Sequence, residues 1–131
     1  MIKRLEIFLE QQPNVELAFL YGSHAVQKAN AESDLDIAIA TSGGLTVDER
    51  LALAEALSHE FHCEVDLVDL STAHGALLQE ILTRGICVIK RNLPLYDKLI
   101  KRMLMEKEDD SRFAAKTTKE RIHKWLHQTK P

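Results

Sequence analysis

Two short hydrophobic runs, residues 15–21 and 34–40, limit the fold more than any other feature of this 131-residue chain. The first run ends at a Gly-Ser dipeptide, and the second opens with Asp34 and Asp36, one residue apart. Because successive side chains of a β-strand point to opposite faces, the two aspartates are predicted on one face and the apolar residues on the other. Two neighbouring carboxylates repel each other and lose solvation, so this pattern predicts a bound cation between them.

The Gly-Ser dipeptide, Gly22-Ser23, stands where the first predicted strand ends. A glycine allows close approach to the backbone, and the N–H groups of such a turn, followed by a short helix over 24–28, bind phosphate oxygens. Magnesium prefers carboxylate oxygens and keeps positions open for phosphate oxygens. The dipeptide, Asp34 and Asp36 therefore predict a site for a metal-bound nucleoside triphosphate.

The remaining hydrophobic pattern alternates between helical and strand periods. The predicted helices cover residues 2–9, 24–28, 46–57, 71–85, 95–104 and 114–126, and the predicted strands cover 15–21, 34–40, 63–70 and 86–90. This order predicts an α/β (α+β) domain, with a mixed β-sheet of about four strands, packed helices and further C-terminal helices.

Local signals place three helix boundaries. Thr46 and Glu49 have the spacing of a capping box. Either Ser71 or Thr72 is expected to cap the next helix, and the acidic segment 106–110 is expected to separate the two tail helices. The apolar face of the helix that begins at the capping box is expected to include Leu51, Leu53, Ala54 and Leu57.

The charges divide the chain into two parts. Residues 1–95 carry 7 Lys and Arg against 14 Asp and Glu, whereas residues 96–131 carry 10 against 6. An acidic body with a basic tail argues against direct, sequence-specific nucleic-acid binding. We predict a core over 1–95 and a C-terminal helical extension over 96–131, which belongs to the same domain or docks on a partner.

Two observations predict a cytoplasmic protein without a membrane partner. No apolar run approaches the length of a membrane span, and the first residues lack the hydrophobic region of a signal peptide. The two cysteines, Cys63 and Cys87, lie in strand-like runs and are expected to be reduced thiols.

The sequence resembles the DNA polymerase β-like nucleotidyltransferase superfamily, and within it the small minimal nucleotidyltransferases. The resemblance covers residues 15–90 and depends on Gly-Ser, ten intervening residues, Asp-x-Asp and a further strand aspartate. It implies a polymerase β-like fold, with Asp34, Asp36 and Asp66 as catalytic residues and metal ligands. Asp69 stays open as an alternative to Asp66 for the third acid.

The resemblance also implies the chemistry. Two Mg²⁺ ions about 3.5–4 Å apart hold the attacking and leaving oxygens while the α-phosphate of ATP is transferred. Asp34 and Asp36 bridge the metals, Asp66 completes one metal shell and helps to deprotonate the acceptor, and Gly22 and Ser23 hold the β- and γ-phosphates.

One departure from the family pattern concerns the residues after the dipeptide. The branch commonly carries Ala-Arg-Gly after Gly-Ser-x, whereas here Ala25 is followed by Val26 and Gln27. A guanidinium is missing at that place, and His24 or Lys28 is the candidate substitute. Nucleotide affinity and preference therefore stay open, while the predicted metal site is unaffected.

The short chain leaves little room for an acceptor-binding domain of its own. It resembles the antitoxins of HEPN/MNT toxin–antitoxin pairs, which implies transfer of AMP from ATP to a tyrosine of a HEPN-domain ribonuclease toxin, within a hetero-oligomer. The modification would inactivate the toxin. Two alternatives stay open: a binding partner that neutralises the toxin without chemistry, and a nucleotidyltransferase that modifies a small molecule such as an antibiotic.

Overall fold

The computed structural model describes residues 1–22 and 34–110. In chain order the elements are α1 (Ile2–Glu10), β1 (Val15–Tyr21), β2 (Leu35–Thr41), α2 (Val47–Phe61), β3 (Val65–Asp69), α3 (Gly75–Arg84), β4 (Ile86–Lys90) and α4 (Leu93–Asp110). Ser23 and the helices predicted over 24–28 and 114–126 lie outside the described residues. Within the described ranges, no helix is both long and apolar enough to cross a membrane.

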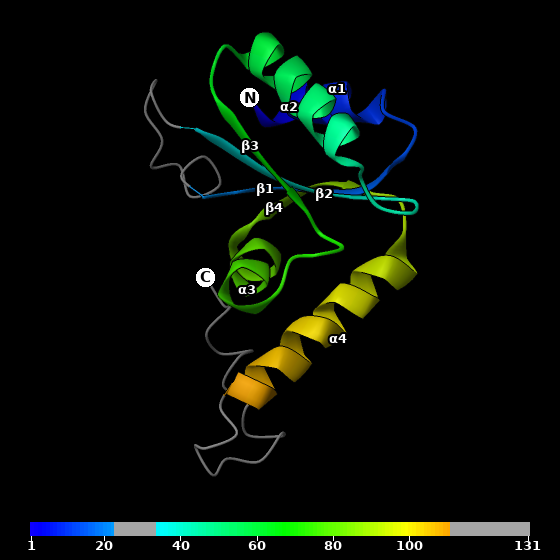
Figure 1. The fold of residues 1–131 in the computed structure, drawn as a ribbon, viewed down its shortest axis with the longest axis vertical. Coiled ribbons are helices and arrows are strands. Elements are labelled where there is room, and N and C mark those ends of the chain that lie inside the picture. Colours follow the sequence, from blue (N-terminus) through cyan, green and yellow to red (C-terminus); the bar gives the residue numbers. More distant parts are fainter. Residues whose placement is uncertain (23–33, 111–131) are drawn as a thin grey trace.

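The strands form one mixed four-stranded sheet in the order β3-β2-β1-β4. Strand β1 is antiparallel to both β2 and β4, whereas β2 and β3 run parallel. Figure 1 shows α1 and α2 on one face of the sheet and α3 and α4 on the other. This arrangement confirms the predicted mixed sheet with helices packed against it.

Both faces of the sheet are buried, because the residues of β1 alternate between two apolar clusters. Ala18 and Leu20 belong to the cluster that includes α1 and α2 residues, and Phe19 and Tyr21 belong to the cluster that includes α3 and α4 residues. All four side chains are 5% exposed or less. Burial on both sides explains why residues 18–20 are an unbroken apolar run rather than an alternating one.

The predicted capping box at the start of α2 is confirmed. The Glu49 backbone N–H donates to Thr46 Oγ1 at 3.1 Å, and the Thr46 N–H donates to Glu49 Oε1 at 3.0 Å. The prediction for the apolar face was wrong at Leu51, which is 60% exposed, whereas Leu57 is fully buried. At about 100° per residue, Leu51 lies more than a quarter turn away from the side that Leu57 buries.

The predicted cap of α3 was wrong. Neither Ser71 nor Thr72 caps this helix, which begins at Gly75. Both residues belong to a preceding turn that is organised by Asp69: the Ser71 N–H donates to Asp69 Oδ1 at 2.9 Å, and the Thr72 hydroxyl donates to the Asp69 carbonyl at 3.1 Å. Ser71 and Thr72 therefore take part in a turn at the end of β3 and do not cap α3.

The acidic segment 106–110 does not separate two helices, which corrects the prediction, because α4 continues through it to Asp110. The Glu106 carboxylate accepts a hydrogen bond from the Gly75 N–H at 2.6 Å, and so satisfies a donor at the start of α3. Leu99 and Met103 of the same helix are buried in the cluster on this face of the sheet. Helix α4 thus stabilises α3 by a hydrogen bond at its first residue and by packing in the same apolar cluster.

Candidate functional site

Three polar side chains form a row at the end of the sheet where β1 ends and β2 and β3 begin. Tyr21 pairs with Asp36 across β1 and β2, and Asp36 pairs with Asp66 across β2 and β3. Ala38 and Val68, two residues further along their strands, pack in the cluster facing α3 and α4. Strand alternation therefore puts Asp36 and Asp66, which we call the acidic pair, on the α3 face.

Gly22 follows Tyr21 and lies directly against Asp36 of the acidic pair. Its φ of +73° is in the left-handed region, where a glycine avoids the strain that an L side chain would meet. A Cβ atom built on Gly22 would collide with Oδ2 of Asp36. The predicted glycine bend and the predicted acid are thus in contact, and the absence of a side chain lets the Asp36 carboxylate lie against the backbone of the bend.

Asp34 occupies a different position from the one the strand pattern predicts. The strand β2 begins at Leu35, whose N–H donates to the Glu64 carbonyl at 2.9 Å, so Asp34 precedes the strand and is exposed. Burial raises the pKa of the free Cys63 thiol, and the negative charge of Asp34 adds to that effect. Asp34 therefore lies close to the turn that leads from α2 into β3.

The structure brings two of the three predicted acids together. Asp36 and Asp66 are paired, with Asp66 exposed and Asp36 half-buried. In residues 1–22 and 34–110, no group of three or more His, Cys, Asp or Glu side chains is arranged to hold a metal ion. The two paired carboxylates nevertheless supply the hard oxygen donors that Mg²⁺ prefers, next to the Gly22 backbone.

The carboxylate of Asp69, the alternative third acid, is used in hydrogen bonds to the backbone. Its carboxylate accepts hydrogen bonds from the Ser71 N–H at 2.9 Å and the Leu45 N–H at 3.3 Å, and the residue is only 9% exposed. It pairs with Ile39 at the opposite end of β2 from Asp36. The geometry therefore favours Asp66 as the partner of Asp36 and gives Asp69 the task of holding two loops.

Tyr21 is a site residue that the sequence reasoning did not single out. Burial raises the pKa of its phenol above the ordinary value, and the negative charges of Asp66, Asp36 and Glu80 raise it further. The hydroxyl therefore stays protonated at neutral pH beside the acidic pair. In the sequence Tyr21 is one apolar strand residue among several, and only the pairing of β1 with β2 places it here.

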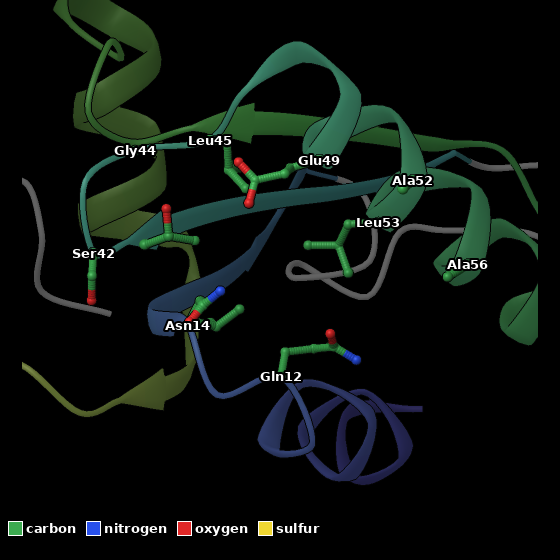
Figure 2. A pocket seen from close by; sticks show the side chains of 11 residues that line it. Gln12, Asn14, Ser42, Gly44, Leu45, Glu49, Ala52, Leu53 and Ala56 are labelled. Carbon is green, nitrogen blue, oxygen red and sulfur yellow. The ribbon is translucent and has the colours of Figure 1, made fainter.

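A hollow of about 320 Å³ lies at the other end of the sheet, between the start of β1, the end of β2 and α2 (Figure 2). Val15 and Thr41, which line it, are paired at the far end of the same two strands that carry Tyr21 and Asp36. Among its lining residues Glu49 is the charged one, and it is negative. Without a cation in its wall, this hollow does not suit a triphosphate.

The fold has counterparts in known proteins. A family model described as "Polymerase beta, Nucleotidyltransferase" matches residues 3–93. The chain belongs to this nucleotidyltransferase family. Over 115 residues it is 30% identical to protein adenylyltransferase MntA of Shewanella oneidensis, a match that covers 88% of this chain and 72% of the relative.

Solved structures confirm the predicted polymerase β-like fold. A crystal structure of a toxin–antitoxin with AMP-PNP has a chain that is 25% identical, with a TM-score of 0.73, over 86% of this chain and 94% of that one. A structure of the tri-AMPylated Shewanella oneidensis HEPN toxin in complex with MNT antitoxin matches at 24% identity and a TM-score of 0.66. That match covers 87% of this chain and 95% of the other, and it shows a shared fold.

Proposed function

We propose that this chain is a magnesium-dependent protein adenylyltransferase that acts as an antitoxin in the cytoplasm. It would transfer AMP from ATP to a tyrosine hydroxyl of a cognate HEPN-domain ribonuclease toxin and thereby inactivate it. The observation that carries the proposal is the acidic pair, Asp36 opposite Asp66, in contact with the Gly22 bend on a nucleotidyltransferase fold.

The metal would be held by Asp36 and Asp66, with Asp34 approaching from the segment just before β2. The carboxylate donors fit Mg²⁺, and Asp66 is exposed, so substrate oxygens can reach the same ion. When bound, Mg²⁺ neutralises charge on the phosphates and orients them for in-line displacement.

The chain's own residues would position both reactants. Gly22 and Ser23 are proposed to bind the β- and γ-phosphates through the backbone N–H groups of the bend, with the Gly22 backbone against Asp36. The tyrosine oxygen of the acceptor attacks the α-phosphorus, and a new oxygen–phosphorus bond forms as the bond to the β-phosphate breaks. The phenolic proton passes to the Asp66 carboxylate, and pyrophosphate leaves.

The comparisons support ATP as the AMP donor and a HEPN toxin as the AMP acceptor. MntA, the 30% identical relative, is a protein adenylyltransferase, and a similar antitoxin structure contains the ATP analogue AMP-PNP. Another complex, which contains a chain of the same fold, holds a tri-AMPylated HEPN toxin together with an MNT antitoxin. Each AMP group adds bulk and negative charge, and such groups near a ribonuclease site would repel RNA phosphates.

The decisive experiment purifies this chain together with its cognate HEPN-domain toxin. After incubation with ATP and Mg²⁺, intact-mass spectrometry should show one or more AMP additions on the toxin, and ribonuclease activity should fall in parallel. D36N and D66N should abolish both effects, whereas D48N, which changes an exposed acid on α2, should not.

Two results would contradict the proposal. No adduct with any nucleotide from a folded wild-type complex would exclude an adenylyltransferase. Full neutralisation of the toxin by D36N or D66N would instead show an antitoxin that acts by binding alone.

A further inference from the structure

The end of α3 lies beside the glycine bend. Leu20 of β1 pairs with Ile86 of β4 in antiparallel register, so the residues before Ile86 run alongside the residues that follow Leu20. Gly85 is packed against this strand end, because a Cβ atom built on it would lie 3.3 Å from the Leu20 carbonyl oxygen. Arg84, the last residue of α3, is therefore at the same end of the sheet as Gly22.

Helix α3 packs on the face of the sheet that carries the acidic pair. Glu80 precedes Arg84 by four residues, and residues at this spacing lie one turn apart on the same side of a helix. Leu78 of this helix is buried in the same cluster as Tyr21, the residue that pairs with Asp36. The same helix borders an open, polar hollow of about 340 Å³, which is lined by Ala76, Gln79, Glu80, Thr83 and Arg84.

The guanidinium of Arg84 is available to a ligand. Arg91 and Arg102 each donate hydrogen bonds to backbone carbonyls and thus hold loops together. The Arg84 side chain is exposed and takes part in none of the side-chain hydrogen bonds or ion pairs within residues 1–22 and 34–110. Arg50 on α2 is likewise exposed and unpaired among these residues, but its helix covers the opposite face of the sheet (Figure 1).

We propose that Arg84 binds the triphosphate of the nucleotide donor, an inference that rests on the proposed function. Among the described residues, Asp36, Asp66 and Glu80 bring negative charge to the α3 side of the site, which opposes a strongly anionic substrate. A guanidinium binds phosphate oxygens with two parallel N–H donors, which gives both charge neutralisation and orientation. Arg84 is thus a positioning and specificity residue that distinguishes a nucleoside triphosphate from a monophosphate.

Equilibrium binding of AMP-PNP and AMP to the full chain in complex with its toxin tests this role directly. R84A should weaken AMP-PNP binding about 10- to 100-fold and leave AMP binding unchanged, because only the triphosphate loses charge-assisted hydrogen bonds. R84K should recover part of the lost affinity, since lysine keeps the positive charge but lacks the two parallel N–H donors of the guanidinium. R50A is the matched control and should bind both nucleotides like the wild type, and all variants should unfold at the wild-type temperature.

Lys28 provides the competing explanation, because it is, with His24, one of the two candidate substitutes for the missing guanidinium. The proposal is overturned if R84A binds AMP-PNP like the wild type, if it loses AMP and AMP-PNP equally, or if K28A rather than R84A carries the triphosphate-specific loss. A wild-type chain that binds AMP-PNP with this Arg84 dependence but transfers no AMP would support the inference on Arg84 and refute the proposed transfer reaction.

Discussion

Asp36 and Asp66 are paired across the parallel strands β2 and β3, although the 29 residues 37–65 lie between them in the chain. Two carboxylates on one face of a sheet repel each other, so the pairing costs stability when no cation is bound. Such an arrangement is typical of a site that is kept for function rather than for the fold. The two acids therefore give a direct way to separate activity from stability.

Replacing either member of the acidic pair should abolish activity without unfolding the protein. We expect D36N and D66N to lower the rate of AMP transfer by about 10²- to 10⁴-fold, because metal binding and proton transfer both depend on these oxygens. The unfolding temperature without metal should stay the same or rise as repulsion is removed. Single-turnover transfer assays and thermal unfolding measure the two effects, and a clearly lower unfolding temperature would contradict the functional role.

Gly22→Ala should destabilise the protein more than Gly43→Ala. Both glycines have positive φ, +73° and +84°, but a Cβ on Gly22 collides with Asp36, whereas nothing lies within 4 Å of one on Gly43. Gly43→Ala should cost about 1 kcal/mol for the backbone alone, and Gly22→Ala should cost about 1–3 kcal/mol more. Urea unfolding measures the difference, and equal costs would show that the contact with Asp36 is unimportant.

Thr46→Ala should lower the free energy of unfolding by about 1 kcal/mol, because it removes the capping hydrogen bond to Glu49. Ser71→Ala is the matched control. Ser71 was predicted as a possible cap, but it lies in a turn where its backbone N–H, not its hydroxyl, bonds to Asp69. Urea unfolding should show a change within about 0.5 kcal/mol for this variant, and a loss as large as that of Thr46→Ala would restore a capping role.

The stability of the protein should fall above pH 10.0, the ordinary pKa of tyrosine, and Tyr21 should account for part of the fall. Burial and nearby acids raise the pKa of Tyr21, so at alkaline pH the unfolded chain loses this proton while the folded protein keeps it. The free energy of unfolding then decreases with a slope of up to about 1.4 kcal/mol per pH unit from this residue. Y21F should show a shallower decrease in urea unfolding between pH 9 and 11, and an unchanged slope would contradict the raised pKa.

Local interactions explain which elements were predictable. The strands Val15–Tyr21 and Ile86–Lys90 have the predicted bounds, because a short apolar run bounded by turn residues is typical of a buried strand. The start of α2 was also predicted, since a capping box closes within four residues. The start of α3 was not, because its first N–H bonds to Glu106, 31 residues away, and no local pattern reports that contact.

The sequence by itself determined the four strands, the Gly-Ser bend and the Asp-x-Asp spacing, because each depends on neighbours in the chain. Only the tertiary structure decided the register that pairs Asp36 with Asp66, the burial of Tyr21 beside them and the position of Arg84 at the same sheet end. It also gave Asp69 a structural role that its spacing does not reveal. The physical reason is that strand pairing brings distant residues together through backbone hydrogen bonds, which do not depend on the identity of the polar side chains they align.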